Sequence, residues 1–503
     1  MPRPPPAISL AWLAPFAPVY GSCLRAADYV HAHRRAACLL GAPLVTLLLV
    51  ALNQLVLLDF PNSGDEYVYL YQARMLATGH ISTATVASPE LFAFNYIVQE
   101  PTRTFGTFPL GWPVALAAAL ALHVPAWLVN PVLGAVTLGL VWTLGARLHT
   151  PRIGVLAAAL VAASPFFAFN AASYFSHTLC GALLLGAACL AAREDRSPAW
   201  VPVAVGLLVG WAVLARYLTG VVVAVPIVLW LLRPGVPRAW TVALVVLGGL
   251  PWIAVLMAYN TALSGSPWRL TMTALTASRW FADGVVLRGA DIFATQILRY
   301  VLWTPPVLLV AYLVYLRTAA RDLRRGAFQW LPVAMAGVLY FYVERGGNQY
   351  GPRFYYEVFP FLAVFVAANV FREGEFAAKA GRDQVLFALL AVSVALMPIG
   401  FAVHAAVERQ VIGERMDPYR MVAEAGLQQA LVLIGGRVGT VRSMAAFDLT
   451  RNDAAHEASV LYGLDQGAPA HCGPQARIAG RTTFLYAWDA AASHGRLRRL
   501  ECP

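Results

Sequence analysis

The sequence predicts an all-α polytopic membrane protein that ends in a small extracytoplasmic α/β domain. Of its 503 residues, 59% are hydrophobic and 13% are charged, whereas a soluble protein of this length would have about twice that charged fraction. Apolar runs long enough to cross a bilayer recur up to residue 404. From residue 405 onward this pattern stops, and short strand-like runs such as 459–462 and 483–486 favour a small folded domain.

A membrane span needs roughly 20 apolar residues, and on that criterion we expect about eleven spans. They lie near 38–58, 129–147, 153–171, 178–192, 199–215, 218–232, 239–259, 293–316, 328–343, 354–371 and 385–404. The apolar segment Pro109–His123 is only about fifteen residues long, a length that suits a re-entrant or interfacial helix better than a crossing.

The distribution of arginine orients these spans. If 109–123 does not cross, every basic link lies on the same side as the basic N-terminus, which the positive-inside rule assigns to the cytoplasm. These links contain Arg147, Arg152, Arg193, Arg196, Arg233, Arg238, Arg317, Arg321, Arg324, Arg325, Arg372, Lys379 and Arg382. We therefore expect a cytoplasmic segment over 1–37, a transmembrane domain over 38–404 with a large outer loop over 60–128, and an extracytoplasmic domain over 405–503.

Charge and cysteine usage narrow the class further. The net charge of +11 does not indicate a nucleic-acid partner, because most arginines lie in the short links between apolar runs. Lys379 is the only lysine, and the abundance of Ala, Arg and Gly is typical of a GC-rich bacterial genome, so we expect the protein in a bacterial inner membrane. None of the cysteines shows CxxC spacing, which gives no support to a zinc site. Cys472 and Cys502 could pair outside the cytoplasm or remain free thiols.

Two adjacent carboxylates, Asp65 and Glu66, follow the first span directly and are the candidate catalytic residues. Ionisable groups at a membrane boundary usually mark chemistry or a pathway, because placing them there is costly. A carboxylate can take a proton from an acceptor hydroxyl as that hydroxyl attacks. One carboxylate is enough for this, so Glu66 could instead orient a group or bind a divalent metal. The alternative is an amphipathic helix start, whose first turn favours acidic residues through the helix dipole.

The loop over 344–356, between the ninth and tenth spans, is a second candidate region because it combines glycines, arginines and aromatic residues. Glycines allow tight turns, and arginines can meet an anionic group with fork-like hydrogen bonds. The candidate substrate-binding residues here are Arg345, Gln349, Tyr350, Arg353 and Tyr355. A plain interfacial loop would need tyrosines and an arginine, but not this density of polar groups.

Weaker substrate-binding candidates lie elsewhere on the same predicted face. Arg216 and Tyr217 interrupt an apolar block, His177 lies between the third and fourth spans, and Glu100 and Arg103 close the outer loop. Each has a structural alternative, since an arginine can extend to lipid headgroups and a lone histidine is more often structural than a ligand. The segment around Glu100 could be a proline-rich turn before an interfacial helix anchored by tryptophan.

Several known chemistries have no support in the sequence. The chain contains no Walker A loop, no dinucleotide-binding glycine fingerprint, no HExxH motif and no nucleophile elbow. Nucleotide hydrolysis and serine-type hydrolysis are therefore not indicated.

Four motifs recur in a recognisable order. First, the acidic pair begins a tyrosine-rich helix that ends at Ala77-Thr78-Gly79, and Glu100-Pro101 then precedes a Trp-containing interfacial helix. A short basic hairpin follows, formed by Leu144–Leu148 and Arg152–Gly154. Finally, Tyr350–Tyr355 precedes a late span. Over roughly residues 38–371 this arrangement resembles the GT-C superfamily of membrane glycosyltransferases. Within it, the chain is most similar to the branch of the protein O-mannosyltransferases and lipid A aminoarabinose transferases.

The resemblance implies a sugar carried on a polyprenyl phosphate and transferred, with inversion, to a lipid, glycan or protein acceptor on the extracytoplasmic face. Asp65 would be the base that activates the acceptor, and Arg353 would hold the phosphate together with Arg103, Arg216 or Arg345. Tyr350 and Tyr355 would line the passage of the sugar or lipid. Members of the superfamily differ in their dependence on a metal. The aminoarabinose transferases have a lysine where this chain has Glu100, so Arg103 is the expected substitute from that loop.

Two other functions share some of these features. A flippase or transporter of a lipid-linked saccharide would line its path with polar residues, but here the predicted spans lack charges deep in their middles. An O-antigen polymerase or ligase would use a diphosphate-linked donor, and large basic outer loops would be its expected mark.

Overall fold

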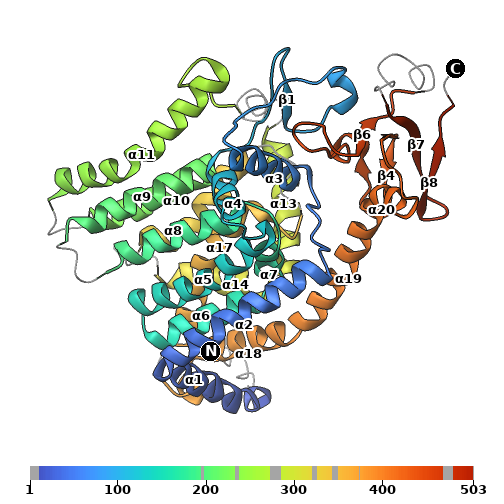
Figure 1. The fold of residues 1–503 in the computed structure, drawn as a ribbon. Coiled ribbons are helices and arrows are strands. Elements are labelled where there is room, and N and C mark those ends of the chain that lie inside the picture. Colours follow the sequence, from blue (N-terminus) through green and yellow to red (C-terminus); the bar gives the residue numbers. More distant parts are fainter. Residues whose placement is uncertain are drawn as a thin grey trace.

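Figure 1 shows a computed structural model in which a large bundle of helices is joined to a small domain that contains a sheet. The structure describes residues 11–193, 198–232, 237–271, 285–319, 326–342, 349–372, 374–467 and 480–501. The described N-terminus and the C-terminus lie at opposite ends of the molecule (Figure 1). Three parts follow along the chain: the bundle, an outer segment inserted after its second helix, and the C-terminal domain.

The bundle consists of apolar helices that pack around buried aliphatic and aromatic side chains. Its elements are η1 (Ala11–Leu13), α1 (Phe16–Ala32), α2 (Arg34–Leu55), α5 (Ala126–Leu148), α6 (Pro151–Ala162), α7 (Pro165–Ala172), α8 (His177–Ala191), α9 (Trp200–Ala215), α10 (Tyr217–Leu231), α11 (Arg238–Ser264), α13 (Val285–Trp303), α14 (Val307–Ala319), α15 (Gly326–Gln329), α16 (Leu331–Phe341), η4 (Arg353–Val358), α17 (Phe359–Val370), η5 (Phe376–Ala378), α18 (Gly381–Ala395) and α19 (Met397–Arg415).

Four helices among the described residues are individually long and apolar enough to cross a membrane, and six spans result if each of two bent pairs counts as one. The four are Arg34–Leu55, Ala126–Leu148, Arg238–Ser264 and the combined Gly381–Arg415. Five further apolar helices have 10–17 residues, which at about 1.5 Å per residue falls short of a hydrocarbon core of about 30 Å. The chain is therefore a multi-pass membrane protein, and the count of eleven spans stays a prediction.

Two predicted spans are each divided into two helices that meet at a sharp angle, and the prediction that each pair crosses the membrane stays a prediction. The predicted span 153–171 is divided into α6 and α7, which meet at 70°, and the predicted span 293–316 is divided into α13 and α14, which meet at 111°. Proline explains both bends, because it has no backbone N–H and its ring displaces the preceding turn. Pro165 follows the first break directly, and Pro305 and Pro306 lie within the second.

Two of the predicted basic links lie beside the N-terminal helix. Asp28 of α1 accepts hydrogen bonds of 2.9 and 2.7 Å from Arg152. The Tyr20 hydroxyl donates to the carbonyl of Arg372 at 2.7 Å, and the Lys379 ammonium lies 5.1 Å from the Tyr20 ring centroid. These contacts bring the links at Arg152 and at Arg372–Lys379 together with the N-terminal helix, and the orientation of the spans stays a prediction.

The outer segment follows α2 and covers the other end of the bundle (Figure 1). It contains α3 (Gly64–Ala77), η2 (Pro89–Phe92), the antiparallel strands β1 (Ile97–Gln99) and β2 (Thr104–Gly106), and α4 (Gly111–Ala121). The start of α3 is fixed by its N-cap, because the Ser63 hydroxyl accepts a hydrogen bond of 3.2 Å from the backbone N–H of Glu66. The short helix expected over 109–123 is α4.

The C-terminal domain continues directly from α19, which extends past residue 404 to Arg415 without a flexible linker (Figure 1). Helix α20 (Asp417–Glu424) is followed by β3 (Ala430–Ile434), β4 (Arg437–Val438), β5 (Met444–Ala445), η6 (Ala446–Asp448), β6 (Val460–Leu464), β7 (Thr482–Asp489) and β8 (His494–Arg499). The four-stranded sheet has the order β6-β3-β7-β8, with β3 parallel to β6 and β7, and β8 antiparallel to β7. The predicted strand runs over 459–462 and 483–486 are confirmed as parts of β6 and β7.

Candidate active site

The first feature of the site is an ion pair between Asp65 and Arg353. Asp65 belongs to the first turn of α3, and Arg353 begins η4. A guanidinium nitrogen of Arg353 lies 2.6 Å from Asp65 Oδ2, and the side chains are only 9% and 18% exposed, respectively. The fold thus brings together the two residues that the sequence singles out as base and phosphate ligand.

The Arg353 guanidinium is held firmly but is not saturated with hydrogen bonds. It lies 4.0 Å from the centroid of the Phe175 ring, a cation–π contact. Its Nε and Nη1 atoms are buried, and neither has a hydrogen-bond partner among the described residues. Buried donors without partners are costly and rare in native proteins. Two nitrogen atoms of Arg353, Nε and Nη1, are therefore available as donors to an anionic ligand.

Glu66 lies next to this pair and is almost fully buried, with 1% of its surface exposed. One carboxylate oxygen accepts a hydrogen bond of 3.0 Å from the backbone N–H of Tyr174. The other oxygen has no hydrogen-bond partner among the described residues. Burial raises the pKa of Glu66 to about 7, against the lowering effect of the Tyr174 hydrogen bond and of Arg353. Glu66 therefore changes its charge near neutral pH.

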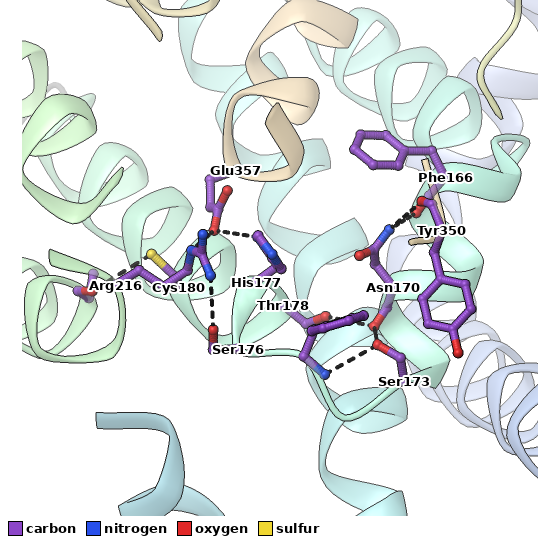
Figure 2. A network of polar contacts seen from close by, with 12 residues as sticks. Phe166, Asn170, Ser173, Ser176, His177, Thr178, Cys180, Arg216, Tyr350 and Glu357 are labelled. Carbon is purple, nitrogen blue, oxygen red and sulfur yellow. Dashed lines mark hydrogen bonds and ion pairs between the residues drawn. The ribbon is translucent and has the colours of Figure 1, made fainter. Parts of the chain in front are cut away.

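A second buried charge cluster joins His177, Arg216 and Glu357 (Figure 2). Glu357 Oε1 lies 3.0 Å from His177 Nδ1 and 3.0 Å from Arg216 Nε. Arg216 also donates to the Ser176 hydroxyl at 3.2 Å, and that hydroxyl lies 3.1 Å from the Tyr69 hydroxyl of α3. His177 and Arg216, which the sequence analysis predicts as site residues, thus both contact Glu357, which it does not predict.

The aromatic ring of Phe354 connects the two clusters. The guanidinium carbons of Arg353 and Arg216 lie 5.8 and 5.7 Å from its centroid, and the His177 ring centroid lies 6.3 Å away. Phe354 follows Arg353 directly in η4. A change at either arginine can therefore reach the other through a single packed ring.

The backbone before η4 is fixed by a tight turn. Tyr350 and Gly351 both have positive φ, 56° and 93°, and a Cβ atom at Gly351 would lie 2.8 Å from Phe166 and 3.1 Å from Trp303. Asn170 donates a hydrogen bond of 3.0 Å to the carbonyl of Tyr350 (Figure 2). Only glycine meets both conditions at position 351. This turn orients the start of η4 and hence Arg353.

The remaining predicted residues of this region lie close by. The buried Tyr350 hydroxyl accepts a hydrogen bond of 3.4 Å from the Asn62 amide, one residue before the N-cap of α3. Gln349 precedes it, with an amide nitrogen that has no hydrogen-bond partner among the described residues, and the same is true of the Tyr217 hydroxyl beside Arg216. Tyr355 lines a narrow cavity with Phe293 and Tyr342. Arg345 lies outside the described residues.

Glu100 and Arg103 contact each other and the end of α11 rather than Asp65 or Arg353, and their role in substrate binding stays a prediction. Their side chains pair with each other at 2.7 Å. Arg103 also donates to the carbonyls of Ala262 and Leu263 at 2.9 and 2.6 Å. Three of its donors are thus used to fasten the outer segment to the C-terminal end of α11, where a cation is favoured by the helix dipole.

Sequence reasoning missed Glu357, Phe175 and Tyr174. Glu357 was detectable, because a carboxylate inside the predicted apolar span 354–371 is expensive unless it is used. Phe175 and Tyr174 gave no comparable signal, since aromatic residues at a span boundary are ordinary.

The described residues contain no group of three or more His, Cys, Asp or Glu side chains arranged to hold a metal ion. Glu66, the residue considered as a metal ligand, uses one carboxylate oxygen for the backbone of Tyr174. Its second oxygen is the only part of it that lacks a hydrogen-bond partner within the described part of the chain.

Comparisons with known proteins identify the class of fold. A family model described as dolichyl-phosphate-mannose-protein mannosyltransferase matches residues 106–260. The chain is similar to the crystal structure of ArnT from Cupriavidus metallidurans bound to undecaprenyl phosphate, with a TM-score of 0.56 and 14% identity over 90% of this chain and 93% of that chain. For ArnT in the apo state the TM-score is 0.55 and the identity 13% over the same shares. A search of curated proteins gives no match.

These similarities confirm the resemblance that the motifs predict. The chain has the fold of the GT-C membrane glycosyltransferases, and its similarity extends over nearly the whole length of ArnT. Within that fold, the Asp65–Arg353 pair joins the first turn of α3 to the start of η4, and the His177–Arg216–Glu357 cluster joins the start of α8 and the α9–α10 junction to η4.

Proposed function

We propose that this protein transfers a sugar from a polyprenyl phosphate to an acceptor hydroxyl on the extracytoplasmic face of a bacterial inner membrane, with inversion at the anomeric carbon. One observation carries the proposal: a buried arginine with two unpartnered donors is paired with a partly exposed carboxylate. Such a pair offers an anion site and a base next to each other. The similar crystal structure of ArnT bound to undecaprenyl phosphate supports a lipid phosphate as the anion in this proposal.

The donor phosphate would bind first to Arg353. The unpartnered Nε and Nη1 atoms can donate hydrogen bonds to phosphate oxygens, and the cation–π contact with Phe175 keeps the guanidinium plane in position. A bound phosphate competes with Asp65 for the positive charge of Arg353. The Asp65 carboxylate then becomes available to a second substrate.

Asp65 would act as the general base of the transfer step. It takes the proton of the acceptor hydroxyl while the acceptor oxygen forms a bond to the anomeric carbon. The bond from that carbon to the phosphate oxygen breaks, and its electron pair leaves with the phosphate. Arg353 stabilises the extra negative charge on the leaving group. Attack from the face opposite the phosphate inverts the anomeric centre.

The second cluster would support the donor site rather than perform the proton transfer. Arg216 provides another positive charge near Arg353 through the Phe354 ring, but it is already paired with Glu357. Glu357 fixes the orientation of both Arg216 and His177. We therefore assign Arg216, His177 and Tyr217 to positioning, and Tyr350 with Gln349 to the boundary of the sugar site.

The decisive experiment uses a strain from which the coding gene is deleted. Mass spectrometry of its envelope glycans, glycolipids and glycoproteins should reveal a missing sugar, and the wild-type protein should restore it. Asp65→Asn should insert normally in the membrane but fail to restore the sugar, while the matched surface variant Asp489→Asn restores it. Full restoration by Asp65→Asn would rule out Asp65 as the base. Reconstituted protein that moves labelled lipid without forming a glycosidic bond would favour a flippase instead.

A further inference from the structure

A second cavity lies between the outer segment and the C-terminal domain, and the proposed reaction does not use it. It has a volume of about 430 Å³. Its walls come from the segment after α2, from α3, from the end of α4 and the start of α5, and from the loop after η6, together with Tyr174 before α8 and Tyr419 of α20. It is large enough for the headgroup of a lipid or a sugar ring.

This cavity is separate from the Asp65–Arg353 pair because it uses another face of α3. Tyr67, Leu70 and Arg74 line it, and residues three and four positions apart lie on one side of a helix with about 3.6 residues per turn. Asp65 lies nearly opposite that side and contacts Arg353. A ligand in this cavity would therefore have its own binding groups.

Two arginines in the cavity lack the partners that arginines usually have. The Arg451 guanidinium carbon lies 4.3 Å from the Phe60 ring centroid and 5.5 Å from that of Tyr67. Its Nη1 atom is buried without a hydrogen-bond partner within the described ranges. Neither Arg451 nor Arg74, which also lines the cavity, forms an ion pair with any described carboxylate. Both cations can accept an anion from outside the protein.

The acidic side chains of the cavity, by contrast, are already engaged. The Tyr174 hydroxyl donates to Asp59, and Asp453 accepts backbone hydrogen bonds of 3.0 and 3.1 Å from Glu457 and Ala458. Protein donors thus occupy the carboxylates. Arg451 donates to the Asp448 carbonyl at 3.0 Å and to Met444 Sδ at 4.0 Å and lies over two aromatic rings, and the Arg74 side chain donates no hydrogen bond to a described residue. The cavity is therefore prepared for a negatively charged group.

One wall of the cavity is apolar and belongs to the turn that joins α4 and α5. Leu120, Ala126 and Trp127 form this wall, and Leu122 in the same turn is 75% exposed. An exposed leucine beside a tryptophan is typical of the interface between headgroups and acyl chains. An anionic ligand that also carries hydrocarbon chains would match both the arginines and this apolar wall.

We infer that this cavity is a second anion site that binds the phosphate of an anionic lipid. Arg451 and Arg74 bind the phosphate, the rings of Tyr67 and Trp127 contact the headgroup, and the acyl chains lie along the α4–α5 turn. A water-soluble phosphate ester has the same anionic group but lacks the chains. The inference does not depend on sugar transfer, since it concerns a different face of α3.

The test measures binding to the purified full-length protein in detergent by native mass spectrometry. The probes are phosphatidylglycerol, zwitterionic phosphatidylcholine and water-soluble glycerol 3-phosphate. Arg451→Gln and Arg74→Gln should each weaken phosphatidylglycerol binding by about tenfold, because a hydrogen-bonded charge contact is lost. Arg496→Gln, on the exposed edge of the C-terminal domain, is the matched control and should bind like the wild type.

The outcomes separate the alternatives. Stronger binding of phosphatidylglycerol than of phosphatidylcholine, lost in both cavity variants but kept in Arg496→Gln, supports the inference. Equal binding of the two lipids, or equal loss in the control, overturns it. Binding of glycerol 3-phosphate without the lipid overturns the lipid part. The Arg74 side chain is exposed and donates no hydrogen bond to a described residue, so Arg74→Gln remains informative if Arg451→Gln folds poorly. Because Asp65→Asn leaves this cavity intact, it should bind the lipid normally even if it transfers no sugar.

Discussion

Arg353 combines three contacts in one planar group: a carboxylate at 2.6 Å, an aromatic face at 4.0 Å, and free donors for a ligand. Lysine has a comparable charge but neither the fork of donors nor the plane that stacks on a ring. The structure therefore requires more at this position than a positive charge.

Arg353→Gln should reduce the initial rate of sugar transfer by about a hundredfold or more, the usual effect of losing a group that stabilises developing charge. Arg353→Lys should recover only part of that loss. The measurement uses membranes from the complemented deletion strain, with protein amount matched by immunoblot. Arg496→Gln serves as the surface control. A fully active Arg353→Lys variant would show that the forked geometry is not needed.

Glu66 gives stability a dependence on pH with a defined sign. Its pKa is about 7 in the folded protein and near 4.5 as an ordinary glutamate. Between these values the folded state binds more protons than the unfolded state, so the free energy of unfolding falls as pH rises from about 4.5 to 7. Asp448, whose pKa burial raises to about 6, contributes with the same sign at slightly lower pH.

The apparent melting temperature of the detergent-solubilised protein should therefore fall between pH 5 and pH 8. In Glu66→Gln the fall should be smaller, because the amide keeps an acceptor for the Tyr174 N–H but does not titrate. Scanning calorimetry or a thiol-independent thermal shift assay measures the difference. An identical fall in wild type and Glu66→Gln would assign the pH dependence to other groups.

At the level of elements, the turn before η4 controls the position of Arg353. Gly351→Ala adds a Cβ atom at a positive φ and against Phe166 and Trp303. Backbone strain of this kind costs about 1–3 kcal/mol before any steric contact is counted, so the variant should lose both thermal stability and transfer. Gly337→Ala, in the middle of α16 with no heavy atom within 4 Å of the added carbon, is the matched control. It should be as stable as the wild type or slightly more stable.

The elements show what the sequence could predict and why some predictions failed. Apolar runs located most helices within a few residues, since burial in lipid or core requires a continuous apolar segment. Hydropathy does not show where the axis of a helix changes direction, so the apolar runs around Pro165 and around Pro305–Pro306 were each predicted as one span without a bend. The prolines themselves were visible and could have indicated both breaks.

The same distinction applies to the candidate site. Asp65 and Arg353 are exceptional in composition at a membrane boundary, and the fold brings them into contact. Arg103 is equally exceptional in sequence, but its donors bind carbonyls at the end of α11. A charged residue at a membrane boundary is predicted to interact with some partner. Only the three-dimensional arrangement shows whether that partner is a ligand or another part of the protein.

At the level of the whole molecule, the C-terminal domain is fastened to the outer segment at several places. Arg415, at the end of α19, donates to the carbonyl of Asn62 at 2.8 Å. Thr450 donates to the carbonyl of Ala93 at 2.9 Å, and the Tyr67 hydroxyl donates to the carbonyl of Asn452. The domain thus lies against α3 on the same side as the candidate site, and both must face the same compartment.

Reporter fusions test this compartment directly. Alkaline phosphatase fused after residue 501 should be active, because it folds only outside the cytoplasm, and a fluorescent protein fused there should be dark when exported through the general secretory route. Fusions within the basic link at 372–382 should give the opposite result. Active phosphatase at both places would contradict the arginine-based orientation.

The contact between Asp65 and Arg353 also has a kinetic consequence. In the free enzyme the carboxylate is engaged by its own arginine, so an acceptor that arrives first finds no base available. A donor that arrives first brings the negative charge that draws Arg353 away. We therefore expect compulsory order in the steady state, with the lipid-linked sugar as the leading substrate and the acceptor as the second. Initial-rate patterns with a dead-end acceptor analogue should then show uncompetitive inhibition against the donor.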